Sequence, residues 1–285
     1  MSELLGLLPQ LSISLDVRIL LSALVVSIAV SVAALIRNRQ SLRAPVDSVA
    51  DLGAIFESPA SLLPHLNELR IRVTSSLIAI LAASVGAAFL AGTVLDVLAE
   101  PIGGLEKLQV IEVTESIRVY FLVSLTVGII LASPYVISQL WIFVAAGLKP
   151  EERRWFYLLF PFAIILFLTG VAFAFFVMLP VAVPFLTGFL GIRTVPRLQS
   201  YVEFVTGVLV WVGLSFEMPL IVYLLAKAKI ITAGMLARGW RIAVVGIAIL
   251  AAVITPTPDP INMGIVALPL LALYVLSIVL ALFAR

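Results

Sequence analysis

The chain has 285 residues, of which 62% are hydrophobic and only 12% are Asp, Glu, Lys or Arg. Together with a mean hydropathy of +1.21, this composition excludes an ordinary soluble domain, in which about a quarter of the residues are charged, and indicates a multi-spanning membrane protein. The absence of cysteine excludes disulfides and thiolate metal sites, and a single histidine excludes a multi-histidine metal centre.

Seven apolar segments are long enough to be considered as membrane spans. They cover residues 18–36, 73–91, 118–145, 156–182, 201–226, 242–255 and 263–283. The sixth segment is short for a bilayer about 30 Å thick, so it requires local thinning of the bilayer or an extension into the interface. The sequence therefore predicts an all-α polytopic fold.

Individual residues between and within the spans predict local features. Pro64 is expected to open a short helix before the second span. The apolar face of that helix is formed by Leu62, Leu66, Leu69 and Val73, which predicts a helix lying in the membrane interface. Residues 92–117 are long enough to form a folded external cap. Pro134 predicts a kink in the third span, and Pro180 and Pro184 predict the end of the fourth.

The distribution of basic residues predicts the orientation of the chain. Thirteen of the 18 Lys and Arg residues lie on one side of the membrane, among them Arg37, Arg70 and Lys149. Because Lys and Arg are concentrated in cytoplasmic loops, this side is predicted to be cytoplasmic, with the N-terminus outside and the C-terminus inside. The first apolar segment is followed rather than preceded by most of its basic residues, which predicts a retained anchor rather than a cleaved signal peptide.

Glu217 lies within the fifth apolar segment, and no other charged residue occurs between Glu203 and Lys227. An ionised carboxylate near the centre of a membrane helix costs roughly 3 kcal/mol. A functional role or a partner that hides the carboxylate is therefore expected. The alternative is a protonated carboxyl group that is hydrogen-bonded within the bundle and serves packing alone.

Acidic residues also lie at two predicted cytoplasmic entry points. Glu68 occurs in the segment HLNELRIR, and Glu151 and Glu152 occur in GLKPEERR. Carboxylates can each hold a guanidinium group through paired hydrogen bonds, a geometry that lysine cannot copy, so two such sites could bind a pair of arginines. The alternative is local pairing, since Glu68 precedes Arg72 by four residues and Glu152 adjoins Arg153.

Motifs of enzymes are missing from the sequence. There is no phosphate-binding GxxxxGK[ST] loop, no HExxH pair and no GxSxG nucleophile motif. An intramembrane protease would need paired aspartates, a Ser–His pair or a zinc motif within the spans, where only Glu217 is found. The sequence therefore predicts neither an enzyme nor a bound metal or cofactor, and any work that the protein does must draw on an external source.

Four motifs, in this order, resemble the TatC family, the multi-spanning receptor subunit of the twin-arginine protein translocase. They are HLNELRIR, SPYVISQLWIFVAAGLKPEERR, GLSFEMP and ITPTPD. The resemblance covers about residues 62–283 and implies a concave six-helix core in the cytoplasmic membrane of a bacterium or archaeon. The family's own termini are cytoplasmic, so residues 1–55 are interpreted as an extra N-terminal transmembrane anchor with a basic linker, and residues 56–285 as the core.

The resemblance also implies roles for single residues on the cytoplasmic surface. The family recognises the twin-arginine signal peptides of folded cargo there, and Glu68 and Glu152 match its recognition positions. Arg70, His65 and Glu151 lie beside them in the same motifs and complete the candidate signal-binding set.

A second set is implied for contacts with other subunits. Glu217 matches the family's buried glutamate, which contacts the single-span partner subunits TatA and TatB. Pro219 belongs to the same motif, and Glu115 and Asp259 match recurrent acidic positions. Self-association within the complex is also implied.

Three hypotheses follow for the function. In the first, the chain is a receptor core that binds twin-arginine signal peptides and recruits single-span partners for export driven by the proton-motive force. In the second, it is a proton-coupled secondary transporter with Glu217 as a proton relay, although no broken helix or repeated half is evident. In the third, it is a scaffold paralogue without signal recognition. The third is motivated by Leu122 and Val275, which replace a lysine and a glutamate of the family.

Overall fold

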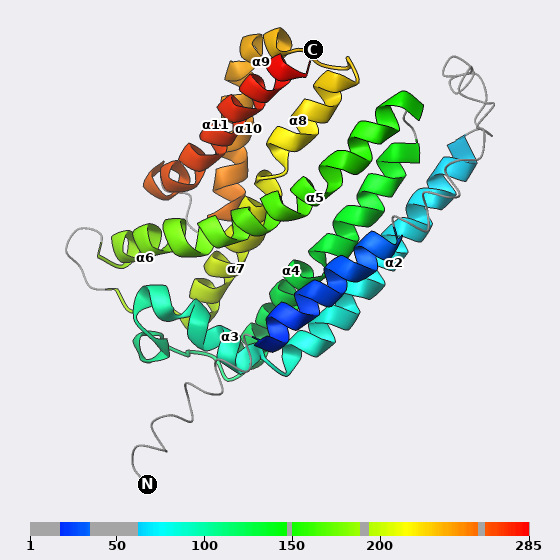
Figure 1. Ribbon diagram of the computed structural model, residues 1–285. Coiled ribbons are helices and arrows are strands. Elements are labelled where there is room, and N and C mark those ends of the chain that lie inside the picture. Colours follow the sequence, from blue (N-terminus) through cyan, green and yellow to red (C-terminus); the bar gives the residue numbers. More distant parts are fainter. Residues whose placement is uncertain (1–17, 35–61, 147–149, 189–193, 256–259, 285) are drawn as a thin grey trace. The chain divides into compact units, whose positions relative to one another are not determined.

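The computed structural model describes residues 18–34, 62–146, 150–188, 194–255 and 260–284, and the regular structure of these ranges is helical (Figure 1). The helices that are long and apolar enough to cross a membrane are Leu66–Ala88, Glu115–Val144, Leu158–Gly188, Leu198–Lys227 and Met263–Phe283. Two shorter apolar helices are Arg18–Ala34 and Trp240–Ile254. Together they confirm the seven expected apolar segments, including the short sixth one.

The chain forms two compact units. The first extends to Gly86 and resumes over Gly128–Phe160, whereas the second contains Ala87–Val127 and continues from Pro161. Three helices pass from one unit into the other: α2 (Leu62–Ala88), α4 (Glu115–Ala146) and α5 (Pro150–Phe173).

Helix α2 begins before the membrane segment and runs through it without interruption. The prediction of a separate interfacial helix is therefore wrong. Pro64 lies in the first turn of α2, where its missing N–H breaks no intrahelical bond. No further proline follows in the helix, so nothing ends it before the membrane. Leu66 and Val73, on the face expected to lie in the interface, are both exposed.

Gly128 of α4 allows a close approach to α2 within the first unit. A Cβ atom at Gly128 would lie 2.7 Å from the backbone N and Cα of Ser84. Because carbon atoms in contact are normally about 3.5–4.0 Å apart, only glycine fits at this position. Such contacts matter in lipid, where helices gain little from burying apolar side chains against one another and associate through close packing.

Helix α4 continues on both sides of Pro134. A prolyl nitrogen cannot donate a hydrogen bond to the carbonyl group four residues earlier, here that of Ile130. The Ser133 hydroxyl donates to this carbonyl oxygen instead, at 2.7 Å. The serine therefore satisfies an acceptor that the proline leaves open on a buried side of the helix, while the expected kink stays a prediction.

The prediction that Pro180 and Pro184 end the fourth span is wrong. After α5 the chain forms a π turn over Ala174–Met178 and continues as α6 (Leu179–Gly188). A π turn has a different hydrogen-bond spacing from an α-helix, and this one lies directly before the position where Pro180 cannot donate. The span therefore extends past both prolines.

From Leu198 onward, the described residues of the second unit form five helices. They are α7 (Leu198–Ser215), α8 (Met218–Lys227), α9 (Ala233–Arg238), α10 (Trp240–Ile254) and α11 (Pro260–Phe283). Helix α11 packs against α8 and α10 (Figure 1). The Tyr274 hydroxyl donates to the Leu236 carbonyl oxygen at 2.6 Å, which ties α11 to α9.

Two glycines bring α5 and α7 together in the second unit. A Cβ atom at Gly170 would lie 2.9 Å from Cα of Gly213 and 2.8 Å from Cγ of Phe216. The Phe216 ring also contacts Phe173, with 5.5 Å between the ring centroids. This packing fixes the end of α7, directly before Glu217.

Residues 91–114 form a folded cap, as expected. It consists of α3 (Ala91–Leu98) and two 3-10 turns, Glu100–Ile102 and Leu105–Lys107. Gly103 and Gly104 connect these turns with φ angles of 91° and 110°, a left-handed region that glycine adopts without strain.

Backbone hydrogen bonds attach the cap to the start of α7. The Gln109 amide donates to Pro196 O at 3.0 Å, and the Leu198 amide donates to Gln109 O at 2.8 Å. The buried Tyr201 hydroxyl donates to Leu98 O at 2.8 Å. The cap therefore has a defined position relative to α7 within the second unit.

Candidate functional site

Glu68 pairs with Arg72 one turn further along α2. Arg72 Nε donates to Glu68 Oε1 at 3.0 Å, and a second guanidinium nitrogen contacts the same oxygen. Arg72 also donates to Gln139 Oε1 at 3.4 Å, which links α2 to α4 within the first unit. The local pairing that the spacing predicts is therefore confirmed. Glu68 Oε2 has no hydrogen-bond partner among the described residues, and the side chain is 32% exposed.

The other members of the predicted signal-binding set are only partly described. Arg70 is exposed on α2. Glu151 and Glu152 lie in the first turn of α5, but their side chains and that of His65 lie outside the described residues. The structure consequently describes one carboxylate of the expected pair.

Glu217 lies at a break between two helices of one span. Helix α7 ends at Ser215 and α8 begins at Met218, so Phe216 and Glu217 form a turn. Bonds to the third residue back tighten this turn, including Glu217 N to Leu214 O at 3.1 Å. Pro219 has no N–H to continue the helical pattern. A broken helix is therefore present, contrary to the sequence-based expectation that no span is interrupted.

The Glu217 carboxyl group is buried at this break. The residue is 6% exposed, and Oε1 has no hydrogen-bond partner among the described residues. A buried polar atom without a partner typically costs about 1–3 kcal/mol. The alternative, a protonated carboxyl group hydrogen-bonded within the bundle, therefore receives no support at this oxygen.

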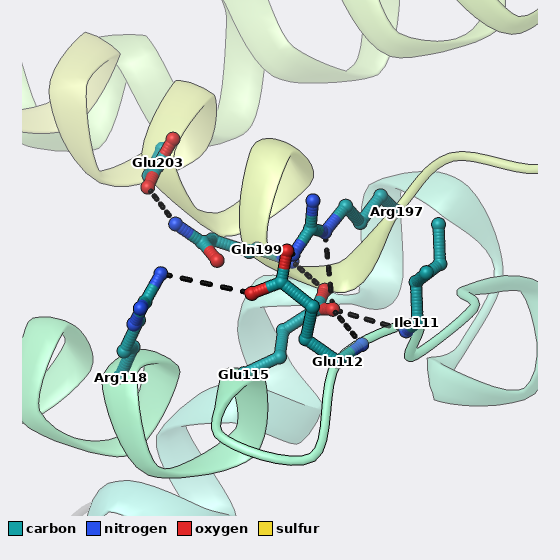
Figure 2. A network of polar contacts seen from close by, with 7 residues as sticks. All are labelled: Ile111, Glu112, Glu115, Arg118, Arg197, Gln199 and Glu203. Atoms are coloured by element: carbon teal, nitrogen blue, oxygen red, sulfur yellow. Dashed lines mark hydrogen bonds and ion pairs between the residues drawn. The ribbon is translucent and has the colours of Figure 1, made fainter.

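Glu115 lies at the start of α4 and is completely buried beneath the cap (Figure 2). Its Oε2 accepts hydrogen bonds from Ile111 N at 3.0 Å and Glu112 N at 3.3 Å. Arg197 Nε donates to the same oxygen at 3.0 Å, and Gln199 N donates to Oε1 at 2.7 Å. One carboxylate thus joins the last loop of the cap to the beginning of α7.

Glu112, Arg118 and Arg197 lie around the Glu115 carboxylate (Figure 2). Arg197 pairs with Glu112 at 2.9 Å, and Arg118 approaches Glu112 at 3.8 Å. The hydrogen bond to Glu112 raises the pKa of the Arg197 guanidinium above its ordinary value, so Arg197 stays charged. Gln199 Nε2 donates to Glu203 at 2.7 Å and extends the network along α7.

Sequence reasoning selected Glu115 but missed its partners. Arg197 and Gln199 are more than 80 positions away in the chain. The sequence does place acidic and basic residues together on the predicted external side. This grouping does not reveal which acidic residue pairs with which basic residue. Asp259 lies outside the described residues.

The fold and these sites define an all-helical, multi-spanning membrane protein with a folded cap and a buried carboxyl group at an interrupted span. A family model described as Sec-independent protein translocase protein (TatC) matches residues 64–269. The chain belongs to the TatC family. Helix Arg18–Ala34 lies outside the matched residues.

Curated relatives and solved structures agree with this assignment. The chain is 40% identical over 232 residues to the Sec-independent protein translocase protein TatC of Carboxydothermus hydrogenoformans, covering 80% of this chain and 96% of that protein. It is 39% identical to TatC of Deinococcus radiodurans, covering 78% and 86%. A crystal structure of the twin-arginine translocase receptor TatC matches with a TM-score of 0.70 and 36% identity, covering 77% of this chain and 99% of that chain.

Proposed function

We propose that the protein is the membrane receptor core of a twin-arginine translocation system. It binds the paired arginines of signal peptides of folded cargo at the cytoplasmic face of the membrane. It then recruits TatA- and TatB-like single-span subunits for export driven by the proton-motive force. The orientation follows from the basic residues, of which 13 of 18 lie on the side taken as cytoplasmic.

The state of Glu68 is the observation that carries this proposal. Arg72, which also donates to Gln139, holds the carboxylate in place through Oε1, and Oε2 remains without a partner among the described residues. A guanidinium group of a signal peptide could donate to Oε2 without displacing Arg72. Glu152, at the beginning of α5, would take the second arginine, with Arg70, His65 and Glu151 beside the two acids.

The break at Glu217 supports recruitment of a partner helix. Glu217 Oε1 is buried and lacks a donor among the described residues, so a polar side chain of a single-span subunit could donate to it once the break opens. Pro219 keeps the span interrupted beside this oxygen. Asp259 is the external acidic residue among the proposed partner contacts. Glu115 accepts its hydrogen bonds from residues of its own chain, so it would act indirectly, through the cap that it holds in place.

Crosslinking to a twin-arginine signal peptide tests signal recognition. The double variant Glu68→Ala, Glu152→Ala should lose most of the crosslink, and a twin-lysine peptide should crosslink weakly to the wild type, because lysine cannot form paired bonds to a carboxylate. The double variant Glu100→Ala, Glu106→Ala, which removes two acids from the cap, is the matched control. Crosslinking by the Glu68, Glu152 variant at the wild-type level contradicts the proposal.

Two further assays separate the alternatives. The interrupted span is a feature of secondary transporters as well, so proton-coupled uptake by reconstituted protein that Glu217→Gln abolishes would favour the transporter. Complementation of a strain that lacks its receptor subunit separates an active receptor from a scaffold paralogue, which would not restore export.

A further inference from the structure

An apolar surface that stays exposed among the described residues lies beside the cap. It consists of five residues with large exposed fractions: Phe89 at 87%, Val113 at 96%, Ile117 at 60%, Tyr120 at 43% and Phe121 at 65%. We call these residues the cap patch. All of them belong to the second unit.

The cap patch follows one side of α4. Ile117 and Phe121 lie four residues apart on the exposed side of α4, whereas Val119 and Val123 on the opposite side are 1% and 0% exposed. Val113 lies in the turn directly before the helix. One turn further along the candidate span, Leu125 is also exposed at 41%, whereas Ser133, two turns beyond it, is buried. The patch therefore extends the exposed apolar side at the start of this candidate span beyond the start of α4 and into the loop of the cap.

The end of α2 brings Phe89 to the same surface. The Tyr120 hydroxyl donates to Ala88 O at 2.7 Å, so the residue directly before Phe89 is bonded to α4. The Tyr120 and Phe121 rings pack edge to face, with 5.8 Å between their centroids. Three aromatic side chains are therefore presented at one end of the spans, and one of them is a tyrosine, a residue type enriched at membrane–water interfaces.

The polar network of the cap holds the patch in place, and the charged residues of this network pair with one another. The Glu115 carboxylate fixes the amides of Ile111 and Glu112, immediately before Val113. In Figure 2 the Ile111 amide faces this carboxylate while its side chain extends away from the network. Glu112 approaches both Arg118 and Arg197. Charges next to the patch therefore meet opposite charges of the same chain.

We propose that the cap patch is inserted into the lipid bilayer and contacts the acyl chains of the leaflet on the side of the cap. The continuity of the patch with the exposed side of a span favours lipid as its occupant over a second protein. The cap would then be anchored to the membrane surface by Phe89 and Val113, and Glu115 would set the depth of that anchor. This inference is independent of signal recognition.

Depth-dependent fluorescence quenching tests the proposal. Because the chain contains no cysteine, the single variants Val113→Cys and Phe89→Cys can each be labelled with an environment-sensitive dye in the full-length protein in nanodiscs. Glu106→Cys, an exposed position in a 3-10 turn of the cap, is the matched control. Phospholipids with a nitroxide on the acyl chain and aqueous iodide are the two quenchers.

The proposal predicts opposite results for the two patch positions and the control position. The acyl-chain nitroxide should quench the labels at residues 113 and 89 at least about threefold more strongly than the label at residue 106. Iodide should show the reverse order, because labels that lie among the acyl chains are near the nitroxide and out of reach of an ion dissolved in water. Equal iodide quenching at residues 113 and 106 overturns the proposal. Acyl-chain quenching that disappears as the protein-to-lipid ratio rises identifies a second copy of the chain as the occupant and also overturns it.

Discussion

Replacement of Gly170 by alanine tests the helix contact that positions Glu217. A methyl group at Gly170 would lie 2.9 Å from Cα of Gly213 and 2.8 Å from Cγ of Phe216. One of these atoms belongs to the backbone of α7 and cannot turn away as a side chain can. The two helices must therefore separate by about 0.6 Å to reach the normal carbon–carbon distance of about 3.5 Å.

Two opposing effects determine the size of the change. Alanine stabilises a helix interior by about 1 kcal/mol relative to glycine. Forcing an extra methyl group into a closely packed contact typically costs about 1–3 kcal/mol. Because the obstructing atom is backbone and the contact is tight on two sides, we expect the upper part of that range and a net destabilisation of about 1–2 kcal/mol.

Gly246→Ala is the matched control for this experiment. Gly246 also lies within a helix, α10, but a Cβ atom there would meet nothing within 4 Å. Only the helix propensity remains, so this variant should be unchanged or more stable by up to about 1 kcal/mol. Thermal unfolding of the purified variants in detergent measures both effects. A Gly170→Ala protein that is as stable as the Gly246→Ala protein refutes the packing argument.

Two further predictions concern single hydrogen bonds. Ser133→Ala removes the donor to Ile130 O and should reduce the free energy of unfolding by about 1–2 kcal/mol; exposed Ser22→Ala is the control in thermal unfolding, and equal effects would contradict the role assigned to Ser133. Tyr201→Phe removes a buried bond to Leu98 O and should speed cleavage within the cap in limited proteolysis, whereas an unchanged cleavage rate would show that this bond does not hold the cap.

Local sequence patterns predicted the apolar helices well, because the formation of these helices depends mainly on nearby residues. Hydropathy located every apolar helix, because the cost of exposing a polar backbone or side chain to lipid applies to each segment separately. The short length of α10 was evident for the same reason, whereas the folded cap was predicted from the length of the connection between two spans. The motif that contains Glu68 and Arg72 also predicted their pairing, since four residues separate neighbours on a helix.

Proline was the least reliable local signal. Pro180 was expected to end a span, but a π turn lets the helix continue. Pro219 lies within the predicted span and there accompanies a real break. The difference depends on how neighbouring groups replace the missing hydrogen bond, as the Ser133 hydroxyl does before Pro134. Residue type alone does not contain this information.

The sequence by itself determined the membrane class, the positions of the apolar helices and the acidic residues to examine, because hydropathy and helical spacing act over short stretches of chain. Only the tertiary structure decided which of these acids are satisfied. Glu115 is held by Arg197 and Gln199 from a distant helix, whereas Glu217 Oε1 is buried without a donor among the described residues. Hydrogen bonds and burial depend on which segments meet in space, and that arrangement is a property of the whole packed chain.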